Sequence, residues 1–224
     1  MNDSLKKRAN ANSETEYFVN LPLNYNVNCK YPLIIVLHGG SGNNNKAFYD
    51  WESKMINNDF ISVYPRGRTL EGSYTNRYGQ TGINDIKEIY QQIIEKYSID
   101  TSLIILAGQS LGGNLAIQLS YNNFPAKGLF LAFPVKPEDF DYKKASELKK
   151  KNLKIVMICG QRDNEFFNGQ QEMANILDSV KVENRFIKYP DLGHYFPVDF
   201  SGQLDNGLQY IINKKLVTTQ AHTP

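Results

Sequence analysis

The chain has 224 residues, of which 41% are hydrophobic and 21% are charged. This length fits one α/β domain better than two, and the composition argues against gross disorder. Lys plus Arg number 25 and Asp plus Glu 23, which leaves a net charge of +2. Phosphate binding usually needs a concentrated basic surface, so this balance argues against nucleic acid as the main partner.

The chain holds two cysteines, Cys29 and Cys159, which are too few for a disulfide scaffold. Cys159 ends an apolar run and is expected to be buried, whereas Cys29 lies in a polar connection; a bridge between them stays open. Three histidines form no zinc-type spacing, so we predict no metal site.

Targeting and membrane signals are weak. No apolar run approaches the roughly 18 residues of a membrane span. The N-terminus carries basic residues but no apolar segment after them, so we expect no intact signal peptide and a cytoplasmic location, while export after signal removal stays open. Residues 1–15 are expected to be flexible, 16–213 to form a single domain, and 214–224 to be a tail.

Short apolar segments alternate with amphipathic ones along the chain. The patterns predict strands over 16–21 (an edge strand), 33–37, 60–64, 103–107, 128–133, 153–158 and 183–189, and helices over 46–58, 85–97, 113–122, 169–180 and 203–213. Asn84 is expected to cap the helix over 85–97, residues 66–82 to form a long loop, and the Lys-rich segment 143–154 to be a solvated helix face.

This alternation predicts a parallel sheet with helices on both faces, in which sites form at the carboxyl ends of the strands. Gly108-Gln109-Ser110-Leu111-Gly112 follows one of these strands and leads into a helix. The Gly-x-Ser-x-Gly pattern in that context is typical of a nucleophile elbow, in which a strained turn exposes the serine hydroxyl. Ser110 is therefore the predicted nucleophile.

A serine hydroxyl needs a neighbouring base, and the base needs a carboxylate to orient it. His194 follows the last predicted strand, whereas His38 is expected to be structural and His222 lies in the tail. Asp163 follows the strand 153–158 and is the predicted acid, with Glu165 and Asp191 as rivals.

Acyl transfer also needs donors for an oxyanion. The first candidate is the backbone N–H of Leu111, just after the nucleophile. The second is expected from His38-Gly39-Gly40-Ser41-Gly42, where Gly40 is favoured over Gly39 and Ser41. The glycine-rich turn lacks the Gly-Lys-Ser/Thr of a phosphate loop, so that interpretation fails.

Taken together, Leu37-His38-Gly39-Gly40, the Ser110 elbow, the loop 160–163 and Gly193-His194 resemble the α/β-hydrolase superfamily. The resemblance is closest to small lidless esterases of the phospholipase/carboxylesterase, polyhydroxybutyrate-depolymerase-like and feruloyl-esterase-like groups. It implies an α/β-hydrolase fold with little or no cap, since residues 134–152 leave little to build one. It also implies hydrolysis of a small-molecule carboxylic ester through a serine acyl-enzyme, without a cofactor.

Substrate contacts are less defined by the sequence. Gly39, Ser41, Gln109, Phe166 and Tyr195 are candidates, because they flank the predicted catalytic residues. Further aromatic residues near the predicted strand ends could line an acyl pocket or belong to the core: Tyr74, Tyr78, Phe133 and Phe167.

Three alternative functions stay open at this point. The same triad could serve a thioesterase or a small serine peptidase, and the chain could be a non-catalytic binding member of the fold. The sequence does not give the oligomeric state.

Overall fold

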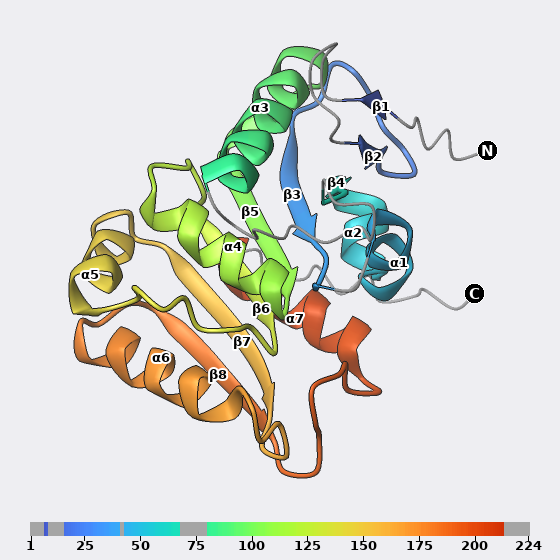
Figure 1. Cartoon of the computed structure of the whole chain (residues 1–224). Coiled ribbons are helices and arrows are strands. Elements are labelled where there is room, and N and C mark those ends of the chain that lie inside the picture. Colours follow the sequence, from blue (N-terminus) through green and yellow to red (C-terminus); the bar gives the residue numbers. More distant parts are fainter. Residues whose placement is uncertain (1–6, 9–15, 41–42, 68–79, 213–224) are drawn as a thin grey trace, which may run out of the picture.

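The computed structural model describes residues 7–8, 16–40, 43–67 and 80–212. Their centre is an eight-stranded sheet in the order β1-β2-β4-β3-β5-β6-β7-β8 (Figure 1). Strand β2 runs antiparallel to its neighbours β1 and β4, and β4, β3, β5, β6, β7 and β8 are parallel to one another. The strands span Lys7–Arg8, Glu16–Asn20, Tyr31–Leu37, Ile61–Pro65, Ile99–Gln109, Gly128–Ala132, Lys154–Gly160 and Asn184–Tyr189, for β1 to β8 in chain order.

Seven helices in the described residues cover the two faces of this sheet (Figure 1). Helices α3, α4, α5 and α6 pack on one face, and α1, α2 and α7 pack on the other. In chain order from α1 to α7 they span Asn44–Asp50, Lys54–Asp59, Gln80–Lys96, Leu111–Tyr121, Tyr142–Lys150, Phe167–Ser179 and Phe200–Ile212.

The continuous apolar strands divide their side chains between two cores. In β3, Leu33 and Ile35 face the helices α3 to α6, while Ile34 and Val36 face α1, α2 and α7. A strand buried on both faces needs apolar residues at every position, which is why these runs do not alternate with polar residues. The predicted parallel sheet with helices on both faces is confirmed.

The predicted single helix over 46–58 is wrong. Two helices, α1 and α2, meet there in a bend, because the side chain of Ser53 accepts a hydrogen bond from the Ile56 N–H and so caps α2. Trp51 and Met55 are both buried in the core on the face of the sheet that α1 and α2 cover.

The boundaries of α3 also differ from the prediction. The helix begins at Gln80, so Asn84 lies inside it and is not its cap, and residues 80–82 are helical instead of part of a loop. The remainder of the predicted loop, 68–79, with Tyr74 and Tyr78, lies outside the described residues.

Residues 134–152 contain helix α5, Tyr142–Lys150, which buries Ala145 and Leu148 in the core and contacts α4 and α6. Its lysines lie on the outer surface, where Lys144 pairs with Asp139 and Lys150 with Glu147. The predicted solvated helix face is confirmed. This segment therefore supports the sheet and does not form a cap over the strand ends.

A pair of glycines in α7 tests the packing of this helix on the sheet. A Cβ on Gly207 would lie 2.3 Å from Cε2 of the buried Phe130, whereas a Cβ on Gly202 would meet nothing within 4 Å. We expect Gly207→Ala to lower the free energy of unfolding by about 1–3 kcal/mol through overpacking. Gly202→Ala should raise it by up to about 1 kcal/mol, because alanine favours helix. Urea unfolding of both variants measures the difference, and equal effects would contradict the packing.

Candidate active site

Ser110 stands between the last residue of β5 and the first residue of α4, with φ 51° and ψ −119°. This backbone conformation is rarely adopted by a non-glycine residue, and such strain is often found at functional sites. A Cβ on Gly112 would lie 2.0 Å from the Leu37 carbonyl oxygen, and a Cβ on Gly108 would lie 2.5 Å from the Gly112 carbonyl. Only glycine at these two positions lets the turn close, so the sequence pattern has a direct steric cause.

The side chains of Ser110, His194 and Asp163 form a continuous chain of hydrogen bonds. His194 Nε2 lies 2.8 Å from Ser110 Oγ, and His194 Nδ1 lies 2.6 Å from Asp163 Oδ2. The Asp163 side chain is 3% exposed and the His194 side chain 31%, so the carboxylate is sealed while the imidazole reaches solvent. Residues from three separate strand ends meet here.

The rival carboxylates lie elsewhere. Asp191 forms an exposed ion pair with Arg162, at 2.5 Å between Oδ1 and Nη2, and Glu165 is exposed. Asp163, by contrast, also accepts hydrogen bonds from the Phe166 backbone N–H at 3.3 Å and the Gln170 side chain at 3.3 Å. Of the three candidates, it is Asp163 that contacts the histidine.

Aromatic rings hold the imidazole from two directions. The ring centroid of His194 lies 4.8 Å from that of Phe133 and 4.9 Å from that of Phe166. Phe133 follows β6 with φ 37°, so the predicted strand end is itself a strained turn. Tyr195 follows His194 and is 58% exposed, whereas Phe167 packs against Phe186, with ring centroids 6.4 Å apart.

The two candidate oxyanion donors are neighbours. A Cβ on Gly40 would lie 2.7 Å from Leu111 Cδ1, so the turn after β3 touches the start of α4. The N–H of Leu111, at the first helical position, has no acceptor within its own helix. A Cβ on Gly39 would lie 3.4 Å from Ser110 Cβ, an ordinary contact, and Ser41 lies outside the described residues.

His38 joins this turn to the segment after β4. His38 is buried, with 1% of its surface exposed. Its Nδ1–H donates to the Gly39 carbonyl oxygen at 2.7 Å, and its Nε2 accepts a hydrogen bond from the Gly67 N–H at 3.1 Å. Burial, together with the nearby Arg66 charge, lowers the pKa of His38 to about 4. The neutral imidazole therefore fixes the backbone of the Gly39-Gly40 turn and is not available as a base.

A family model described as an alpha/beta hydrolase domain matches residues 33–206. The chain belongs to this family. It is also 32% identical over 84 residues to a bifunctional acetylxylan esterase/xylanase of Neocallimastix patriciarum, a match that covers 37% of this chain and 12% of that protein. The chain therefore corresponds to a small part of that relative's length.

Solved structures show the same architecture. A Bacillus cereus protein described as uncharacterized superposes with a TM-score of 0.76 at 25% identity, covering 87% of this chain and 64% of that one. A ferulic acid esterase of Anaeromyces mucronatus, solved with ferulic acid, superposes with a TM-score of 0.66 at 17% identity, covering 86% and 84% of the two chains. At 17% identity, the similarity to the ferulic acid esterase concerns the fold.

Two buried side chains of this α/β-hydrolase complete the site, and sequence reasoning missed their roles. Trp51 Nε1 donates to Gln109 Oε1 at 2.8 Å, which anchors the residue before Ser110. Gln109 was a candidate substrate contact, and its amide oxygen is taken up by this hydrogen bond. Gln170, fully buried in α6, contacts Asp163. The sequence does carry a signal for Gln170, a polar residue on the apolar side of the predicted helix.

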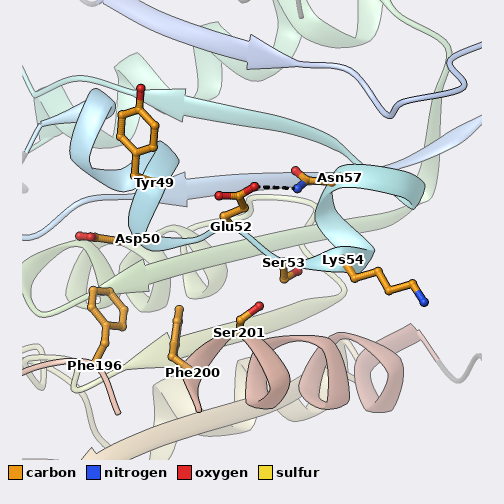
Figure 2. A pocket seen from close by; sticks show the side chains of 9 residues that line it. All are labelled: Tyr49, Asp50, Glu52, Ser53, Lys54, Asn57, Phe196, Phe200 and Ser201. Atoms are coloured by element: carbon orange, nitrogen blue, oxygen red, sulfur yellow. Dashed lines mark hydrogen bonds between the residues drawn. The ribbon is translucent and has the colours of Figure 1, made fainter. Parts of the chain in front are cut away.

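A separate pocket of about 530 Å³ lies between the α1–α2 segment and the start of α7 (Figure 2). Phe196 borders this pocket and packs against Phe133, with ring centroids 5.0 Å apart. Ser110, His194 and Asp163 are not among its lining residues, so it is distinct from the hydrogen-bonded triad.

In the described part of the chain, no group of three or more His, Cys, Asp or Glu side chains is arranged to hold a metal ion. Cys29 is exposed and Cys159 buried, and both thiols are free; burial and the Asp163 charge raise the pKa of Cys159. None of the described helices combines the length and apolar character needed to cross a bilayer.

The buried His38 predicts a pH dependence of stability. Below about pH 6.5 the unfolded chain binds a proton at this residue, whereas the folded chain resists it until the pKa of about 4. The free energy of unfolding should therefore fall by about 2 kcal/mol between about pH 7.5 and pH 5 through this residue alone.

His38→Asn, which keeps a donor for Gly39, should lose that contribution. Urea unfolding of both proteins at the two pH values measures it. The same pH slope in wild type and variant would contradict a neutral, buried His38.

Proposed function

We propose that the chain is a serine carboxylic-ester hydrolase that acts through an acyl-enzyme. The observation that carries this proposal is the continuous hydrogen-bond chain from Ser110 Oγ through His194 to the buried Asp163. A nucleophile, a base within 2.8 Å and a carboxylate on the far nitrogen are the parts that serine acyl transfer requires.

In the proposed first half-reaction, Ser110 Oγ bonds to the acyl carbon while its proton passes to His194 Nε2. The carbonyl electron pair moves onto oxygen, and the N–H groups of Leu111 and Gly40 stabilise that charge. Collapse of the intermediate breaks the bond to the leaving oxygen, which takes the proton from His194 and departs as the alcohol.

Water then repeats the sequence. His194 takes a proton from water as its oxygen attacks the acyl-enzyme, and the acid is released with Ser110 restored. Asp163 keeps its charge throughout, accepts the Nδ1–H and stabilises the imidazolium. No step requires a metal or cofactor.

Carboxylic esters carried on plant saccharides are the substrate class that we propose. The similarity to an acetylxylan esterase/xylanase favours acetyl esters, and the fold shared with a ferulic acid esterase makes feruloyl esters the second candidate. The ring of Phe166, whose centroid lies 4.9 Å from that of His194, and the exposed ring of the next residue, Tyr195, suit a flat or small acyl group. Thioesters and amides use the same triad chemistry, so they belong in the same assay.

Replacing the nucleophile tests the proposal directly. Ser110→Ala should lower turnover of p-nitrophenyl acetate by about 10³-fold or more, because the bond to the acyl carbon cannot form. Ser146→Ala, on the outer side of α5, is the control and should keep full activity. The wild-type protein is then assayed with acetylated xylan, methyl ferulate, a thioester and a peptide amide, and the four rates are compared. Full activity in Ser110→Ala would sink the proposal, and a folded but inactive wild type that resists fluorophosphonate labelling would favour a binding role.

The proposed role of the Gly40 N–H in stabilising the oxyanion can be tested with two matched variants, Gly40→Ala and Gly39→Ala. A Cβ on Gly40 would strike Leu111 at 2.7 Å, whereas the nearest atoms to a Cβ on Gly39 are at 3.4 Å. Because Leu111 Cδ1 is the movable end of a side chain, part of this contact can be relieved without moving the turn. We expect Gly40→Ala to lower kcat by up to about 10-fold through displacement of a donor, with Gly39→Ala less affected. The KM for p-nitrophenyl acetate should change little. An equal loss in both variants would place the second donor elsewhere.

A further inference from the structure

We propose that Gln170 is a positioning residue of the triad, one that holds the Asp163 carboxylate in place for His194. This inference rests on the proposed function. Gln170 lies in α6 and is 0% exposed. Its side-chain Nε2 lies 3.3 Å from Asp163 Oδ2 and 3.1 Å from the backbone carbonyl oxygen of Pro134.

The contacts fix the orientation of the amide. Nε2 carries two hydrogens, and its two neighbours, a carboxylate oxygen and a carbonyl oxygen, are both acceptors. A flipped amide would place Oε1 against two oxygens and lose both hydrogen bonds. Gln170 therefore acts as a double donor that bridges Asp163 and Pro134.

Gln170 occupies a position that packing alone would give to an apolar side chain. The other buried residues of α6 are Met173, Ala174, Ile176 and Leu177, and Gln170 continues their stripe one turn earlier. Among the described residues no group donates to its buried Oε1. An unpaired buried acceptor destabilises a fold, so Gln170 is a costly residue for packing alone, while its Nε2 makes a hydrogen bond to Asp163.

Through its two hydrogen bonds, Gln170 connects the loop that carries Asp163 to the segment that packs on His194. Asp163 Oδ2 accepts from His194 and Gln170, while Oδ1 accepts from the Phe166 N–H. Pro134 directly follows Phe133, whose ring packs on His194. One buried amide thus links the loop that carries the acid to the segment that supports the base.

The first test is Gln170→Met, which keeps the length and volume of the side chain but removes both donors. We expect kcat for p-nitrophenyl acetate to fall about 5- to 20-fold, because a hydrogen bond to a charged group is lost. KM should stay within about twofold, since Gln170 lies behind Asp163 and not at the acyl site. Gln171→Met, at the next position of α6 and partly exposed, is the matched control and should keep wild-type kcat.

The decisive test is a double-mutant cycle with Asp163→Asn. If Gln170 acts through Asp163, then Gln170→Met should have little further effect once the carboxylate is gone. The rate of labelling by a fluorophosphonate measures nucleophile activation even in slow variants. Gln170→Leu, which removes both donors in a smaller side chain, gives an independent variant and should label more slowly than wild type.

The outcomes separate this inference from the function on which it rests. Unchanged kcat in Gln170→Met, a loss that appears only in KM, or an equal loss in the Asp163→Asn background would overturn the role of Gln170 and leave the triad intact. Full activity in Asp163→Asn itself would overturn both the role of Gln170 and the triad on which the proposed function rests. If Gln170→Met does not fold, wild-type labelling by Gln170→Leu overturns the inference alone.

Discussion

Helix α4 begins so close to strand β3 that no side chain fits between them, and the rest of the site depends on this contact. A Cβ on Gly112 would lie 2.0 Å from the Leu37 carbonyl oxygen. The turn that permits this approach forces Ser110 into a φ of 51° and directs its side chain off the sheet. The same approach brings Leu111 against Gly40, so one steric constraint sets both the conformation of Ser110 and the position of the turn beside it.

The polar side chains around this turn differ in how far they are buried. Asp163 and Gln170 are buried, whereas His194 is partly exposed. The imidazole ring packs against both Phe133 and Phe166. A low-dielectric surrounding strengthens the hydrogen bonds that are made and penalises any that are missing. The fixed geometry of the imidazole is therefore a property of the packed loops and not of the three triad residues alone.

The second core matters for the same reason. Trp51 packs edge-on against Phe130, Phe196 and Phe200 and donates to Gln109, so the face covered by α1, α2 and α7 also restrains the elbow. His38 adds a third restraint by tying Gly39 to Gly67. The strained conformation of Ser110 persists because neighbouring groups on both sides of the sheet hold it.

The sequence by itself determined the parallel sheet, its two helical layers and the order of Ser110, Asp163 and His194, because apolar periodicity and glycine spacing are local properties of the chain. It did not reveal that residues 46–58 divide into two helices, since a cap at Ser53 competes with the continuing apolar pattern. Only the tertiary structure decided which carboxylate faces His194, that Trp51 holds Gln109, and that Gln170 lies behind Asp163. Those contacts join segments far apart in the chain, and their geometry follows from how the strand ends and helices pack in three dimensions.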